Sequence, residues 1–81
     1  MRVIGLDVHR TFAVVAILED NVLSNGGGVE LTRDAVVAFG RKLRSNDDVV
    51  IEATGNTTMI VRLLRPLVQR VVIARELLRN A

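Results

Sequence analysis

The chain lacks cysteine, tryptophan and tyrosine, and it has only one proline and two phenylalanines among 81 residues. Without cysteine it forms no disulfides, zinc–thiolate sites or thiol nucleophiles, and this agrees with a cytoplasmic protein. Its longest apolar run, residues 12–18, is the length of a β-strand, which argues against a membrane segment. Asp7 interrupts the first apolar residues too early for a signal peptide. We therefore expect one small cytoplasmic domain with a thin core.

Charge is divided unevenly along the chain. Residues 1–52 carry six basic and eight acidic side chains, whereas residues 53–81 carry five arginines and one glutamate. Arginine makes planar, bidentate contacts with phosphate, so the second half permits a nucleic-acid partner. The alternative is a solvated helix face that keeps a small protein soluble, and the absence of tryptophan and tyrosine for base stacking favours that alternative on charge alone.

Hydrophobic periodicity predicts an α/β order of three strands, a helix, a strand, a second helix and a last strand. Thr32 is the expected N-cap of the first helix, which would end near Arg44, and Pro66 should end or kink the second helix. The three consecutive glycines predict a bulge or frayed edge in the third strand. The expected strands cover residues 2–6, 11–19, 22–31, 49–52 and 70–74, and a single helical turn is expected after them.

The simplest sheet for this order is mixed, with strand order 3-2-1-4-5. Tight turns make the first three strands an antiparallel meander, and each strand after a helix is most simply parallel to the first. The fourth strand is apolar until its last residue, so we expect it to be covered on both faces. In this arrangement Asp7 and Glu52 leave neighbouring parallel strands at their carboxyl ends, where open α/β sheets place their sites.

Two carboxylates held side by side repel each other, so a positive partner is expected beside them. A hard divalent cation such as Mg²⁺ binds carboxylate oxygens and can activate a water or hydroxyl in phosphodiester cleavage. The alternative is structural: Asp7 would cap the following turn and Glu52 would pair with an arginine. The sequence pattern alone leaves both interpretations open.

The segments VIGLDVHRTFAVVAI and VVIEATGNT resemble the N-terminal domain of the DEDD transposases of bacterial insertion sequences, the bridge-RNA-guided group. The segments VELTRDAVVAFGRKL and LLRPLVQRVVIA are similar to the same family, so the resemblance covers essentially the whole chain. It implies a RuvC-like, ribonuclease H-like fold and Mg²⁺- or Mn²⁺-dependent cutting and joining of DNA, with a guide RNA as a further partner. It also implies that Asp7 and Glu52 are the first two acids of the catalytic tetrad.

The family's third and fourth acids form an Asp-x-x-Asp pair that residues 1–81 do not contain, and its C-terminal domain with a catalytic serine is also absent from them. We therefore expect residues 1–81 to be a single truncated domain that binds the metal weakly and is inactive alone.

Further residues near the expected site have both structural and functional interpretations. His9 could touch a phosphate or a metal-bound water, but a turn residue is the commoner role. Gly55 and Asn56 could meet a DNA backbone, although helix capping explains Asn56 equally well. Arg62 and Arg65 could contact DNA, or they could simply face solvent.

Two other functions remain open. A sugar-kinase or actin-like ATPase subdomain would share this sheet, but those folds need a glycine for phosphate where this chain has Val8 and His9. A non-catalytic remnant could instead associate with itself or with an intact transposase through an exposed sheet edge or an uncovered face.

Overall fold

The computed structural model describes residues 1–53 and 55–74. Thr54 and the expected helical turn after the last strand lie outside the described residues. The elements are β1 (Arg2–Val8), β2 (Phe12–Glu19), β3 (Val22–Glu30), α1 (Arg33–Arg41), β4 (Asp48–Glu52), α2 (Thr58–Leu64), the 3₁₀ turn η1 (Arg65–Leu67) and β5 (Arg70–Ile73). Their order along the chain is the one that hydrophobic periodicity predicts.

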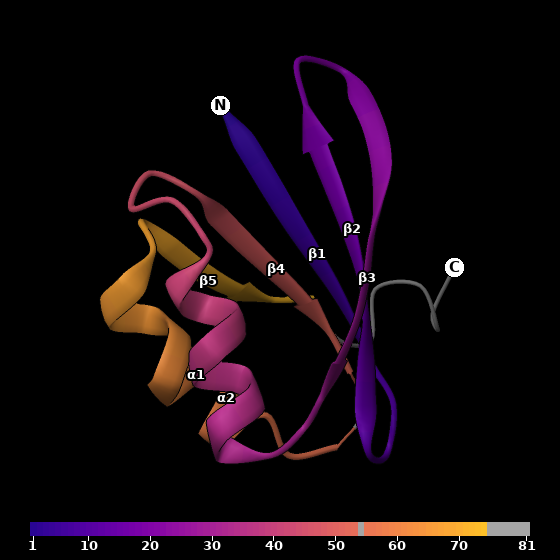
Figure 1. Ribbon diagram of the computed structural model, residues 1–81, viewed down its shortest axis with the longest axis vertical. Coiled ribbons are helices and arrows are strands. Elements are labelled where there is room, and N and C mark those ends of the chain that lie inside the picture. The colour runs from indigo at the N-terminus through magenta and orange to yellow at the C-terminus, as the bar shows by residue number, and fades with distance from the viewer. Residues whose placement is uncertain (54, 75–81) are drawn as a thin grey trace.

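The five strands form one mixed sheet in the order β3-β2-β1-β4-β5 (Figure 1). β1 pairs with β2 in the antiparallel sense and with β4 in the parallel sense, and β5 is parallel to β4. The predicted fold class, strand order and strand directions are therefore confirmed. The antiparallel neighbours are joined by tight turns and the parallel ones by helical crossovers, as short connections require.

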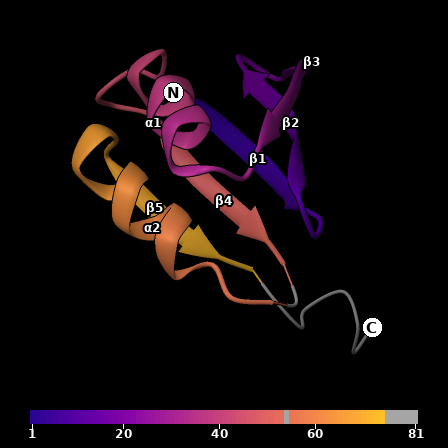
Figure 2. The same cartoon turned by 60° about the horizontal axis from the view of Figure 1, so that its bottom comes forward.

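Both helices lie on the same face of the sheet (Figure 2). They cover a core to which every strand except β3 and β5 contributes fully buried side chains. The most completely buried apolar residues are Ile4, Val15, Val36, Val49, Ile51 and Leu64. Among the described residues, no helix is long and apolar enough to cross a membrane.

The expectation that β4 is covered on both faces is wrong. Val49 and Ile51 are completely buried beneath the helices, but Val50 between them is only half-buried. Val50 pairs with Gly5 of β1 and with Val72 of β5, and alternation along the strands puts all three on the face away from the helices. No described helix packs on that face, which we call the uncovered face.

The helix ends follow local hydrogen-bonding chemistry. Thr32 Oγ1 accepts the Ala35 N–H at 3.2 Å, which confirms the predicted N-cap of α1. α1 ends at Arg41, earlier than expected, because the Arg44 N–H donates to the Asp47 carboxylate at 2.8 Å instead of continuing the helix. α2 gives way to η1 at Arg65, as the position of Pro66 predicts.

β3 carries the predicted irregularity. Its pairing with β2 shifts register between Val15 and Ala16, opposite the glycines. A Cβ at Gly26 would lie 2.6 Å from Val15 Cγ1, so the backbone approaches this core side chain too closely for any larger residue. The bulge is thus the way β3 packs against the core edge of β2.

Asp47 fixes the amino end of the parallel strands. Its carboxylate is completely buried and accepts two hydrogen bonds from the Arg2 guanidinium, at 2.9 and 2.7 Å, besides the Arg44 N–H. The adjacent Asp48 side chain, almost fully buried, pairs with Arg70 at 3.2 Å. These contacts join β1, β4 and β5 at the end of the sheet opposite Asp7.

Candidate functional site

Asp7 and Glu52 are direct neighbours in the structure. They are Cα partners in the parallel pairing of β1 with β4, where Asp7 is the next-to-last residue of β1 and Glu52 the last residue of β4. Neighbouring strands lie about 4.8 Å apart, and partners in register project to the same face of the sheet. The two carboxylates that the sequence brings together therefore meet on the uncovered face.

The two acids border a shallow, mostly apolar depression of that face. Gly5, Val14, Ala16 and Val50 are among its lining residues, all contributed by β1, β2 and β4. The Asp7 side chain is 57% exposed, and Glu52 is half-buried. Small residues at Gly5 and Ala16 leave the floor low, so both carboxylates are open to solvent and to a ligand from the same side.

Neither structural role expected for these acids is present among the described residues. The turn after β1 is closed by backbone atoms, the His9 N–H donating to the Phe12 carbonyl at 2.8 Å. Within residues 1–53 and 55–74, no arginine or lysine forms an ion pair with Asp7 or Glu52. Two neighbouring carboxylates without an arginine or lysine partner in this part of the chain leave room for a cation.

His9 lies beside the acid pair. Its Nε2 is 3.3 Å from Asp7 Oδ2, and its ring stacks on Phe12 with centroids 4.7 Å apart and an interplanar angle of 17°. Both side chains of the stack are nearly half exposed. The stack holds the imidazole towards Asp7, so His9 lies next to the candidate acid pair.

Phe12 lies at the candidate site and was not among the residues that the sequence predicts there. Strand alternation puts it on the same face as Val14 and hence as Asp7, and the short turn brings it back beside His9. The available signal was an aromatic residue at the start of a strand, on the side that the helices leave uncovered.

The other predicted residues are placed around the site without joining it. Asn56 Oδ1 accepts the Thr58 N–H at 2.9 Å, at the first residue of α2, whereas the N-cap position itself is occupied by Thr57, whose side chain makes no capping hydrogen bond. Gly55 and Asn56 also border a depression that includes His9 and Arg10. Arg62 and Arg65 lie further along, on α2 and its end, where they line a separate depression on the helix-covered side.

The donor set suits part of a hard-cation site. Mg²⁺ and Mn²⁺ bind carboxylate oxygens and retain several waters, and the exposed Asp7 and the half-buried Glu52 next to it can supply such oxygens. Within the described ranges, no three or more histidine, aspartate, glutamate or cysteine side chains are grouped so that they could hold a metal ion. Asp7 and Glu52 can therefore contribute two ligands, with water or other groups completing the coordination.

Comparison with known proteins adds no assignment. No protein-family model matches the chain, and no curated protein matches it. The resemblance to the DEDD transposases accordingly stays a prediction that depends on the quoted segments and on the two acids.

Proposed function

We propose that this chain contributes the first two acids of a metal-dependent site for DNA strand cleavage and joining, as in the DEDD insertion-sequence transposases that its sequence resembles. The observation that carries the proposal is the register of β1 and β4, which makes Asp7 and Glu52 direct partners. The remaining acids that the resemblance implies would come from sequence outside residues 1–81. In this proposal the 81 residues alone do not cleave DNA.

Asp7 and Glu52 would hold the metal through their carboxylate oxygens. A bound Mg²⁺ or Mn²⁺ supplies activation of a water or hydroxyl and stabilisation of the leaving oxygen in phosphodiester cleavage. The protein's part is to hold the two carboxylates in register on rigid strands. His9, 3.3 Å from Asp7 Oδ2 and stacked on Phe12, restricts the orientation of the Asp7 carboxylate.

Metal titration tests the proposal without requiring activity. Mn²⁺ should broaden NMR signals around Asp7 and Glu52 in a saturable manner, and calorimetry with Mg²⁺ should show weak binding. Asp7→Asn and Glu52→Gln should each abolish the saturable component. Asp20→Asn is the matched control, because Asp20 is an exposed turn residue far from the acid pair. It follows Glu19, the strand partner of Arg2 at the opposite end of β1 from Asp7.

Two outcomes would end the proposal. One is broadening that is no stronger around Asp7 than around Asp20. The other is saturable binding that both site variants retain. A separate check is the DNA downstream of codon 81: continuation of the reading frame into an Asp-x-x-Asp segment would supply the acids that the proposal requires.

Association is a second candidate function, which the exposed apolar surface favours. Val14, Leu18 and Leu23 are each more than 40% exposed, and register and alternation put all three on the uncovered face. β3 also presents its outer edge along nine residues, nearly all exposed. Size-exclusion chromatography with light scattering at several concentrations tests this function, and a monomer throughout would exclude self-association.

A further inference from the structure

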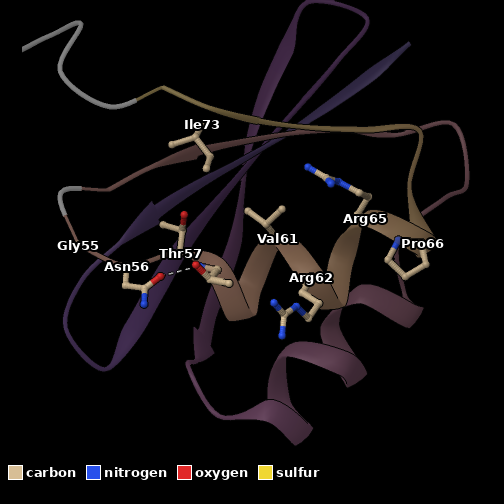
Figure 3. Close-up of a pocket in the computed structure, with 9 residues that line it drawn as sticks. Gly55, Asn56, Thr57, Val61, Arg62, Arg65, Pro66 and Ile73 are labelled. Carbon is tan, nitrogen blue, oxygen red and sulfur yellow. Dashed lines mark hydrogen bonds between the residues drawn. The ribbon is translucent and has the colours of Figure 1, made fainter.

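A second depression lies between α2 and β5, away from the acid pair. It has a volume of about 940 Å³ and opens between the helix and the edge strand. Its described lining comprises Gly55, Asn56, Thr57, Thr58, Val61, Arg62, Arg65, Pro66 and Ile73. Figure 3 shows Val61 of α2 and Ile73 of β5 pointing towards each other across the space, with Asn56 and Thr57 at one end and Pro66 at the other.

The two arginines of this depression differ in their orientation. Arg65 extends from the end of α2 into the space between the helix and β5, whereas Arg62 leaves the helix on its other side, at the rim (Figure 3). Both are exposed. Arg65 is therefore the central cation of the depression and Arg62 a peripheral one.

The charge of the depression has one sign. None of its described lining residues is acidic. Arg2, Arg44 and Arg70 each form an ion pair, but Arg62 and Arg65 take part in none of the ion pairs found among residues 1–53 and 55–74. An anion placed between α2 and β5 would be attracted mainly by the Arg65 guanidinium and more weakly by Arg62 at the rim.

The depression shares two lining residues with a neighbouring depression that reaches His9. Gly55 and Asn56 line it, and the same two residues line the neighbouring depression with His9 and Arg10. His9 in turn contacts Asp7. A path therefore runs from Asp7 past the exposed Arg10 and over the Gly55–Asn56 segment to Arg65. Along it the side-chain amide nitrogen of Asn56 makes no hydrogen bond to any described residue and faces outward, so it can donate to a ligand.

We propose that the α2–β5 depression binds the backbone of a single-stranded DNA segment, with Arg65, and to a lesser extent Arg62, at phosphates. The apolar surface of Val61, Pro66 and Ile73 would contact sugars or the faces of unpaired bases. A duplex keeps those faces stacked and would present only phosphates, so the mixed lining favours an unpaired strand. The choice of DNA depends on the proposed function; the site itself depends on the geometry of the depression.

The experiment is fluorescence anisotropy with a labelled single-stranded oligonucleotide of mixed sequence, about 20 nucleotides long, in EDTA at several salt concentrations. Arg65→Gln should weaken binding about three- to tenfold and reduce the salt slope by about 0.7, the amount expected for one phosphate contact on a single strand. Arg62→Gln should have a smaller effect. Arg41→Gln is the matched control, because it removes the same charge from the exposed last turn of α1, at the Asp47 end of the molecule, and should leave the affinity within twofold.

Three results would overturn the proposal: no binding by the wild type, an equal loss in Arg41→Gln and Arg65→Gln, or equal affinity for the same sequence as a duplex. Competition by a mononucleotide as effective as the oligonucleotide would also overturn it, in favour of a small-molecule site. Urea unfolding of each variant ensures that lost binding is not lost folding. Because EDTA removes the metal, the oligonucleotide measurement does not depend on metal binding by the acid pair, so failure of this proposal and failure of the metal titration are distinguished.

Discussion

The carboxylates at the two ends of the parallel strands have opposite environments. At the amino end of β4, Asp47 is completely buried and bound by Arg2 and by the Arg44 N–H, and Asp48 is paired with Arg70. At the carboxyl end, Asp7 is mostly exposed, and within the described ranges it contacts only His9 among possible cationic partners. Both ends place two acids next to each other, but only one end neutralises them with arginine.

This difference separates acids that stabilise the fold from acids that remain available to a ligand within a single sheet. An acid that is buried and saturated with hydrogen bonds stabilises the fold only while its partners remain, and it offers no free oxygen to a ligand. An exposed acid without an arginine partner adds nothing to the fold, but it keeps its oxygens available. The amino end is therefore built for stability, and the carboxyl end has the properties of a binding site.

The sharpest test of this contrast is Asp47→Asn. The substitution removes the charge that the Arg2 guanidinium binds through two hydrogen bonds and leaves that partly buried cation unpaired. Breaking a buried pair in this manner costs about 3–5 kcal/mol, a large part of the whole stability of a small domain. Urea denaturation followed by circular dichroism should show a strongly lowered midpoint or no folded baseline.

Asp48→Asn is the matched comparison for that measurement. Its partner Arg70 has a side chain that is 65% exposed, so solvent screens the interaction and the expected loss is about 1 kcal/mol. Equal losses at positions 47 and 48 would show that burial of the arginine partner does not decide the cost.

Low pH should reduce the stability that Asp47 contributes at the amino end of the parallel strands. The Arg2 hydrogen bonds, together with the Arg44 N–H, outweigh the effect of burial and hold the pKa of Asp47 below its ordinary value of 3.8. A carboxyl group with a lowered pKa stabilises the fold above its unfolded pKa, and this contribution is lost as the pH falls through the folded pKa. The difference in unfolding free energy between wild type and Asp47→Asn should be constant between about pH 5 and pH 8 and should shrink below about pH 4. A difference that stays constant down to about pH 2 would contradict the ion pair.

The sequence predicts the carboxyl end of the parallel strands, with Asp7 and Glu52, better than the amino end, with Asp47 and Asp48. Asp7 and Glu52 each end an apolar run, and the simplest strand order, with the strands after each helix parallel to the first, makes them neighbours. The contact between Arg2 and Asp47 joins residues 45 positions apart. No local pattern encodes such a pairing, and Asp47 reads simply as part of a polar loop.

Two sequence predictions are wrong, the burial of β4 on both faces and the end of α1, and they are wrong for the same physical reason. A run of apolar residues cannot tell a strand covered on both faces from one that exposes alternate residues to an open, apolar depression, which is the position of Val50. Likewise, the apolar stripe of α1 continues to Leu43, but the helix ends at Arg41 because a carboxylate beyond the stripe takes the Arg44 N–H. In both cases a tertiary contact decides what the local pattern leaves open.

The smallest expected effect is at the carboxyl end of the parallel strands, at Asp7 and Glu52. It is a gain in unfolding free energy, whereas the substitutions at Asp47 and Asp48 cause a loss. Asp7→Asn removes one of two like charges that are direct cross-strand partners, so the unfolding free energy should rise by a few tenths of a kcal/mol. Glu52→Gln should act in the same direction. The double variant should gain no more than either single one, because one substitution already abolishes the mutual repulsion. The gain should shrink with added salt, which screens exposed charges. A clear loss of stability in Asp7→Asn, as at Asp47, would instead show that the carboxyl end also depends on its acids for folding, and the contrast between the two ends would fail.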